Sequence, residues 1–204
     1  MYRVGNEEYV EANGSYGVAT LLREHVQFSK ETIAFDFPAK SGIRRTLVIT
    51  DASLVRALRS LQKNVDQSGR LLVYREGTHS SPLLPRTSML VSNRSWGERY
   101  SVKDLRTWNA TVLAAVAFVD QDIPRSERKR AQAVSAVMNE VSTALGNTPI
   151  MARKSYVDPR VVEAYGAGVT ISRAVGRAEK LTDPAQSRTV IEKAVIRMIK
   201  AVPR

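Results

Sequence analysis

The sequence predicts a mainly helical α+β domain with one prominent β-hairpin. Two β-rich runs, residues 32–37 and 44–50, are separated by a short loop, and their apolar residues alternate as in strands with one buried face. Three longer segments, within residues 101–119, 124–145 and 183–202, place apolar residues at the three- and four-residue spacing of amphipathic helices. Strands collected in the first half and helices in the second are typical of the α+β class.

The first half begins with helical segments that lead into the hairpin. Residues 1–12 have the pattern of the end of a helix, which the turn Asn13-Gly14 closes, and residues 17–26 are expected to form a second, short helix. The loop over residues 38–42 joins the two strands. The hairpin therefore carries Lys40 at its tip.

Another helix is predicted directly after the hairpin. Asp51 is placed to accept hydrogen bonds from the first backbone N–H groups of this helix. The apolar face of the helix consists of Leu54, Val55, Leu58 and Leu61. Residues 66–100 are rich in loop-forming residues, and one more helix is expected within them, around residues 86–93.

The second half contains three strongly patterned helices. Ser101-Val-Lys-Asp104 is a capping box that opens the first of them. Its predicted inward face is Leu105, Trp108, Val112, Val116 and Val119. Pro124 suits the first turn of the second helix, and Gly146-Asn147 ends it. The predicted inward face of the second helix is Ala131, Val134, Met138, Val141 and Leu145.

The last helix begins at Asp183-Pro184 and has one apolar side. That side consists of Val190, Ile191, Ala194, Val195, Met198, Ile199 and Val202. We expect it to pack on the rest of the chain, as amphipathic helices of globular proteins do, and a contact with a partner or with DNA is the alternative.

Charge and missing residue types exclude several classes of protein. The 204 residues carry a net charge of +11, which suits a polyanionic partner. The absence of cysteine excludes disulfide scaffolds, thiol catalysis and cysteine-ligated metal sites. His25 and His79 lack the spacing of metal ligands, so no metal site is expected. The longest uncharged, apolar-leaning run, residues 107–119, is shorter than the ~20 residues of a membrane span. A signal peptide is not expected either, because two glutamates lie near the start of the chain, where a signal peptide has an apolar run.

Two stretches combine residues suited to chemistry on a phosphodiester. Lys103-Asp-Leu-Arg106-Thr-Trp108 opens a predicted helix. Leu145-Gly-Asn147-Thr-Pro-Ile-Met-Ala-Arg-Lys-Ser-Tyr156 closes another helix and ends in a tyrosine nine residues after the asparagine. The sequence has no Gly-x-x-x-x-Gly-Lys phosphate loop, no Gly-x-Ser-x-Gly elbow and no histidine placed to activate a serine. Nucleotide-driven and serine-hydrolase chemistry are therefore excluded.

These stretches resemble the catalytic domain of type IB DNA topoisomerases of the bacterial and poxvirus-type branch. The resemblance extends to Phe37-Pro-Ala-Lys40 and to Tyr2-Arg3-Val-Gly5-Asn6-Glu-Glu-Tyr9, so it covers about residues 1–165. It implies the catalytic core of the DNA breaking-rejoining enzymes, which type IB topoisomerases share with tyrosine recombinases, with a general-acid lysine on the hairpin. The catalytic set that it implies is Tyr156, Arg106, Lys40, Arg3 and Asn147.

The residue types in this set fit the chemistry of strand transfer. Guanidinium groups remain cationic and donate forked hydrogen bonds, so Arg3 and Arg106 suit the excess charge of a phosphorane-like state. Asn147 can donate a neutral hydrogen bond to the same phosphate. A tyrosine phenol has an ordinary pKa of about 10, so a nucleophile at position 156 needs a cationic pocket. The departing 5′-hydroxyl needs a proton, which by resemblance comes from Lys40, with Arg3 or Lys103 as candidate assisting residues.

The resemblance implies a duplex DNA substrate and a 3′-phosphotyrosyl intermediate that is religated without ATP. It implies further DNA contacts by Lys103, Tyr9, Asn6, Arg153 and Lys154. No cofactor, metal or membrane partner is expected. The protein is expected to be a monomer in the bacterial cytoplasm, associated with the nucleoid. Asn147 stands where many relatives have histidine, and asparagine is an accepted variant in the bacterial branch.

The chain is expected to comprise a catalytic domain over residues 1–165 and a basic tail with an amphipathic helix over residues 166–204. Relatives usually carry an N-terminal β-rich domain that closes around duplex DNA. The sequence before Arg3 is too short for it, so we expect a catalytic-domain fragment or a shortened start.

Three alternatives remain at this point. A tyrosine recombinase shares the fold and the nine-residue spacing, but its second arginine normally lies in a His-x-x-Arg motif, where this chain has Lys103-Asp-Leu-Arg106. A non-catalytic DNA-binding fragment and a basic ribosome- or chromosome-associated protein also fit the charge. Taken singly, Tyr156 is a packing residue by default, and Lys40 a solvated turn lysine. The catalytic interpretations alone predict that Tyr156 matters more than any other tyrosine.

Overall fold

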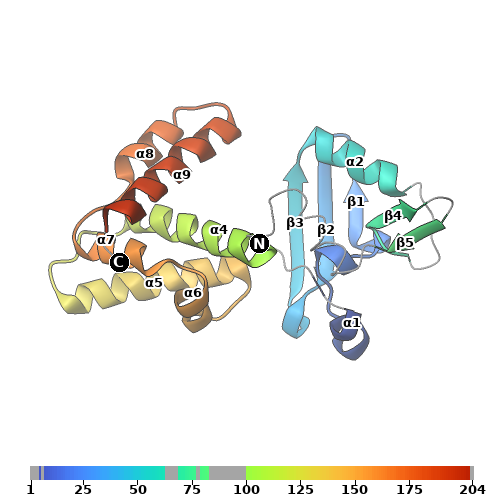
Figure 1. Ribbon diagram of the computed structural model, residues 1–204, viewed down its shortest axis with the longest axis horizontal. Helices are drawn as coiled ribbons and strands as arrows, with labels where there is room; N and C mark the ends of the chain where they lie inside the picture. The colour runs from blue at the N-terminus through green and yellow to red at the C-terminus, as the bar shows by residue number, and fades with distance from the viewer. Residues whose placement is uncertain (1–4, 6, 63–68, 77–78, 83–99, 203–204) are drawn as a thin grey trace. The chain divides into compact units, whose positions relative to one another are not determined.

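A computed structural model describes residues 5, 7–62, 69–76, 79–82 and 100–202 (Figure 1). The chain forms two compact units, Tyr2–Val102 and Lys103–Arg204. We call them the N-terminal and the C-terminal unit. The architecture is mixed and mainly helical, as predicted, with a small antiparallel sheet in the N-terminal unit.

Among the described residues, the hairpin forms two of the three strands of the main sheet in the N-terminal unit. Strands β2 (Thr32–Pro38) and β3 (Arg44–Thr50) pair antiparallel, with Ile33 opposite Ile49 and Phe35 opposite Leu47. The alternation predicted for the first strand holds, because Ile33, Phe35 and Phe37 are all buried. Strand β1 (Val26–Phe28), which the sequence pattern did not predict, pairs with the other edge of β2.

Helix α2 (Ala52–Gln62) follows the sheet and begins as predicted. One carboxylate oxygen of Asp51 accepts hydrogen bonds from the backbone N–H groups of Ser53 and Leu54, both at 2.9 Å. Val55 and Leu58 of this helix are buried in the same apolar cluster as the strand residues Ile33 and Phe35. The unit also contains helix α1 (Glu7–Asn13) and a two-stranded sheet of β4 (Val73–Glu76) and β5 (His79–Pro82).

The helix predicted over residues 17–26 is instead two 3₁₀ turns, η1 (Val18–Thr20) and η2 (Arg23–His25). Between them the backbone pairs with a distant segment. The N–H of Leu71 donates to the carbonyl of Leu21 at 2.8 Å, and the N–H of Arg23 donates to the carbonyl of Gly69 at 3.0 Å. These non-local bonds hold residues 21–22 extended, which a continuous helix would not allow. The helix expected over residues 86–93 lies outside the described residues.

The C-terminal unit contains only helices among its described residues. They are α4 (Val102–Ala117), η4 (Phe118–Asp120), α5 (Glu127–Leu145), α6 (Pro149–Ser155), α7 (Pro159–Gly166), α8 (Ser172–Ala178) and α9 (Pro184–Ala201). Helices α8 and α9 lie on one side of α4, and α5 and α6 lie on the other (Figure 1). One apolar cluster includes buried residues from all of these helices.

The buried face of α4 differs from the predicted one. Ala110, Ala114 and Ala117 are buried, whereas Leu105 is 38% exposed. The larger predicted residues from Trp108 to Val119 are only partly buried around this alanine stripe. Because α4 has neighbours on opposite sides, small side chains occupy its most crowded positions, and a search for large apolar residues misses them.

Side-chain caps set most helix boundaries in the C-terminal unit. Thr148, Asp158 and Asp183 each accept a backbone hydrogen bond at the start of a helix whose first residue is proline. Helix α5 begins after Ser126, later than Pro124 suggests, and the predicted inward residue Ala131 is exposed. None of the described helices is both long and apolar enough to cross a membrane.

Candidate active site

Three residues of the predicted catalytic set come together in the C-terminal unit. Arg106 lies in the second turn of α4 and is only 5% exposed. Its guanidinium carbon lies 5.3 Å from the centroid of the Tyr156 ring, within the range of a cation–π contact. Its Nη2 atom donates to the carbonyl oxygen of Leu145, the last residue of α5, at 3.3 Å. The cation therefore lies at the negative end of the α5 dipole, a favourable place for it.

Asn147 is held between two helix ends. Gly146 caps α5 in the left-handed region, with φ of 65°, and the backbone N–H of Asn147 donates back to the carbonyl of Ser142 at 3.0 Å. Directly after Asn147, the Thr148 hydroxyl accepts from the N–H of Met151 and starts α6. The side-chain nitrogen of Asn147 is buried. This residue therefore lies in a short, fixed connection beside the carbonyl that Arg106 contacts.

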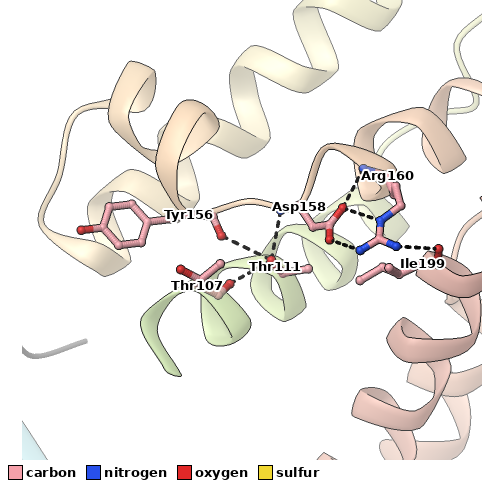
Figure 2. A network of polar contacts seen from close by, with 6 residues as sticks. All are labelled: Thr107, Thr111, Tyr156, Asp158, Arg160 and Ile199. Carbon is pink, nitrogen blue, oxygen red and sulfur yellow. Dashed lines mark hydrogen bonds and ion pairs between the residues drawn. The ribbon is translucent and has the colours of Figure 1, made fainter. Parts of the chain in front are cut away.

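Tyr156 is the residue at which α6 ends. Its backbone N–H donates to the carbonyl of Ala152 at 3.1 Å, and its side chain is half-buried against the apolar cluster of the unit. Figure 2 shows its ring directed away from the polar network formed by Thr111, Asp158 and Arg160, whereas its carbonyl group faces that network. The backbone of Tyr156 is therefore held on one side, while its ring lies toward Arg106.

Tyr165, on α7, shows what a structural tyrosine looks like in the same unit. It is 1% exposed, and its hydroxyl donates to the carbonyl of Asp122 at 2.7 Å. Its ring stacks on Phe118 with centroids 4.4 Å apart. Burial raises the pKa of the Tyr165 phenol above its ordinary value. Each of these features favours a neutral packing residue, whereas Tyr156 faces a guanidinium.

Lys40 lies in the connection between β2 and β3, as predicted. It is the first residue of the 3₁₀ turn η3 (Lys40–Gly42) and is exposed. Its Nζ atom lies 5.6 Å from the centroid of the Tyr9 ring, so two of the predicted site residues of the N-terminal unit are neighbours. The geometry places the lysine on the hairpin, and its role as a general acid stays a prediction.

A bidentate ion pair lies at the base of the Lys40 turn. The guanidinium of Arg44 contacts the carboxylate of Asp36 at 2.6 and 2.8 Å. This hydrogen-bonded partner lowers the pKa of Asp36 below its ordinary value. Inside the turn, the N–H of Ala39 donates to the carbonyl of Ile43 at 2.8 Å. The backbone that carries Lys40 is therefore defined, although its side chain is exposed.

The other predicted site residues are distributed as follows. Arg3 and Asn6 lie outside the described residues. Lys103, in the first turn of α4, is exposed, as are Arg153 and Lys154 at the end of α6. Exposed cations a few residues before Arg106 and Tyr156 in the chain fit the expectation of contacts with a polyanion.

Sequence reasoning did not single out Thr111, which is in contact with the backbone after Tyr156. Its hydroxyl oxygen lies 3.3 Å from the carbonyl oxygen of Tyr156 and accepts a hydrogen bond from the N–H of Asp158 at 3.1 Å. Threonine is an ordinary residue in a helix, and the contact joins positions 45 residues apart. No local sequence signal identifies such a contact.

Two comparisons relate the chain to known proteins. A family model described as "Eukaryotic DNA topoisomerase I, catalytic core" matches residues 1–180. The protein "DNA topoisomerase 1B" of Acanthamoeba polyphaga mimivirus is 27% identical over 176 residues, which make up 80% of this chain and 50% of the viral protein. The chain thus spans about half the length of this curated relative.

Proposed function

Because the chain belongs to the DNA topoisomerase I catalytic-core family, we propose that it is a type IB DNA topoisomerase, which relaxes supercoiled duplex DNA by transient cleavage of one strand. The observation that carries the assignment of the nucleophile is the buried guanidinium of Arg106, 5.3 Å from the ring of Tyr156 and beside Asn147.

In the proposed reaction, the phenolic oxygen of Tyr156 attacks the phosphorus atom of one backbone phosphodiester. A bond forms between this oxygen and phosphorus, the bond from phosphorus to the 5′-oxygen breaks, and the phenol gives its proton to solvent. The product is a 3′-phosphotyrosyl enzyme and a free 5′-hydroxyl strand. The reverse attack by the 5′-hydroxyl restores the DNA, so the cycle consumes no ATP.

Arg106 and Asn147 act on the phosphate in this proposal. The low exposure of Arg106 supports this role, because a preorganised cation in a water-poor site stabilises developing negative charge more strongly than one in bulk water. Asn147 donates from its amide to a non-bridging oxygen. Arg3 is proposed as the second guanidinium, on the resemblance alone.

Lys40 is proposed as the general acid that protonates the departing 5′-oxygen. Its place on an exposed hairpin turn supports this role, since the ammonium group is accessible to a ligand as large as duplex DNA. Tyr9, Asn6, Lys103, Arg153 and Lys154 are proposed to contact the DNA backbone. The net charge of +11 agrees with a polyanionic partner.

Covalent trapping tests the proposal. The wild-type chain is mixed with an internally labelled plasmid fragment of several hundred base pairs, which samples many sequences, and the reaction is stopped with a denaturing detergent. Labelled protein is expected for the wild type and is expected to disappear in Tyr156→Phe. Tyr165→Phe is the matched control and should still be trapped, because Tyr165 has a packing role in the same unit.

Relaxation of supercoiled plasmid separates this activity from the alternatives. A topoisomerase removes supercoils and releases intact circles, whereas a tyrosine recombinase would also exchange strands between two molecules. A chain that binds DNA but yields no covalent band would contradict the proposal and favour a binding fragment. Trapping of Tyr156→Phe at the wild-type level would refute the nucleophile assignment.

A further inference from the structure

The hydroxyl of Thr111 connects α4 to the backbone on both sides of Val157. Thr111 is 2% exposed, and its Oγ1 atom accepts from the N–H of Asp158 at 3.1 Å. The same oxygen lies 3.3 Å from the carbonyl oxygen of Tyr156 and 2.8 Å from that of Thr107, and it donates its one proton to either (Figure 2). A single buried hydroxyl thus contacts two consecutive peptide groups after the tyrosine.

This contact links the tyrosine to the helix that also carries the arginine. Arg106 and Thr111 are five residues apart on α4, which corresponds to about 7.5 Å along the helix axis. The guanidinium of Arg106 faces the Tyr156 ring, and the hydroxyl of Thr111 accepts from the N–H of Asp158 and contacts the carbonyl of Tyr156. The spacing between phosphate-binding group and nucleophile is therefore set by one rigid element.

A second layer of contacts supports the same segment. The carboxylate of Asp158 accepts from the N–H of Arg160 at 3.0 Å and forms a bidentate ion pair with its guanidinium at 2.9 and 2.6 Å. This partner raises the pKa of Arg160. The guanidinium also reaches the carbonyl of Ile199 on α9 at 3.5 Å (Figure 2). Because Asp158 is fixed from its side chain, its N–H remains directed at Thr111.

We propose that Thr111 is a positioning residue for Tyr156, which fixes the orientation of the nucleophile relative to Arg106 without touching the DNA. This inference rests on the proposed function. Transfer to tyrosine requires its oxygen to lie in line with the bond that breaks, and a misplacement of about 1 Å can lower a rate by ~10²-fold. A hydroxyl at this position therefore affects the chemical step rather than binding.

Three variants of the full 204-residue chain test this role. Thr111→Val keeps the branched shape and removes the hydroxyl, Thr111→Ser keeps the hydroxyl and removes the methyl group, and Thr111→Ala removes both. The matched control is Thr143→Val. The hydroxyl of Thr143 donates to the carbonyl of Asn139 at 3.0 Å, a bond within α5 that does not involve Tyr156.

The measurement is single-turnover cleavage with protein in saturating excess over a short labelled duplex. The duplex contains a cleavage site mapped beforehand with the wild type, and it is labelled at the 5′ end of the strand that becomes attached. The dissociation constant for the same duplex and the unfolding temperature are measured for each variant, and cleavage is assayed well below the lowest unfolding temperature. Covalent protein is counted after denaturation at successive times.

We expect Thr111→Val and Thr111→Ala to cleave between about tenfold and ~10²-fold more slowly than the wild type, with an unchanged dissociation constant. Thr111→Ser should recover the rate to within about twofold, because its hydroxyl can make the same hydrogen bonds. Thr143→Val should cleave at the wild-type rate. Rescue by serine separates positioning by the hydroxyl from packing by the methyl group.

Three results would overturn the proposal. Thr111→Val at the wild-type rate would show that the hydroxyl is dispensable, and if that variant does not fold, Thr111→Ala decides in the same way. A serine variant as slow as the valine variant would assign the effect to packing. A wild type that forms no covalent complex would remove the proposed function and this inference together, whereas a cleaving wild type with unaffected variants removes the inference alone.

Discussion

The surroundings of Arg106 and the surroundings of Lys40 differ in how each cation is held. Arg106 is 5% exposed and lies between the end of α5 and the Tyr156 ring, inside a cluster that includes all helices of its unit. Lys40 is exposed on a turn, where the Tyr9 ring is its neighbour and the ion pair at the base of the turn is exposed as well. Packing thus orients Arg106, the proposed phosphate-binding group, in the absence of DNA, whereas Lys40, the proposed acid, remains exposed.

The first test of this difference is Arg106→Ala, for which we expect the largest effect. Loss of one preorganised donor to the transition state should slow single-turnover cleavage by about 10³-fold. The unfolding temperature should fall too, because the guanidinium is buried and its removal leaves a cavity. Arg106→Lys should recover little of the rate, since an ammonium group lacks the planar fork. Cleavage within tenfold of the wild type would contradict the role assigned to this residue.

Lys40→Ala should slow cleavage by about 10²-fold, as expected for loss of a general acid. The unfolding temperature should not change, because the side chain is exposed. A duplex in which sulfur replaces the departing 5′-oxygen provides the control. A thiol has a pKa near 8.5 and leaves without a proton, so this duplex should restore the rate of Lys40→Ala but not that of Arg106→Ala. If this duplex did not restore the cleavage rate of Lys40→Ala, Lys40 would not be the general acid.

Two substitutions at helix ends, one in each unit, are expected to lower the free energy of unfolding by similar amounts and so sharpen the comparison between the units. Gly146→Ala places a Cβ atom at φ of 65°, and Asp51→Ala removes the side chain that accepts two hydrogen bonds at the start of α2. Each should lower the free energy of unfolding by about 1 kcal/mol in a denaturant titration. Only Gly146→Ala should slow cleavage, because Asn147 follows the strained residue. Equal cleavage by both variants would show that the loop geometry is not critical.

The smallest expected effect is a pH dependence of the N-terminal unit. His25 is buried, and its Nδ1 atom accepts from the N–H of Leu22 at 3.1 Å. Burial lowers the pKa of His25, an effect that Arg70 reinforces and that Glu24 and Asp36 oppose. The unfolded chain therefore binds a proton more readily below about pH 6.5, so stability should fall as the pH decreases through that value.

Replacement of His25 tests the origin of this pH dependence. His25→Asn keeps an acceptor near the N–H of Leu22 and cannot be protonated in this range, so its stability should vary less between pH 7 and pH 5. Denaturant titrations at several pH values measure the difference. An NMR titration in the wild type that places the pKa of His25 above 6.5 would contradict the predicted loss of stability at low pH.

The elements that could be predicted are those with local signals. The alternation around Phe35 and the caps at Asp51 and Asp183 located a hairpin and two helices correctly. Strands β1, β4 and β5 are three or four residues long and have no readable periodicity, so they were missed. The buried alanines of α4 were missed because a search for large apolar residues passes over them.

The site residues were singled out by their motifs, and their catalytic roles stay predictions. The structure has Lys40 in the connection between the two strands and brings Arg106 within 5.3 Å of the Tyr156 ring centroid. Thr111 and Arg160 could not be found, because their contacts with the Tyr156 segment and with α9 join positions about 40 residues apart in sequence. Such contacts depend on tertiary packing and have no periodic signature.

The polar network around Asp158 has a mechanical consequence for the proposed reaction. A strand attached to Tyr156 transmits the torque of unwinding DNA to the peptide groups that follow the tyrosine. Hydrogen bonds to Thr111 on α4, together with the ion pair from Asp158 to Arg160 and its contact with α9, distribute that load over two long helices. In the proposed reaction, the protein end of the covalent link is therefore anchored on both helices while the free DNA end rotates.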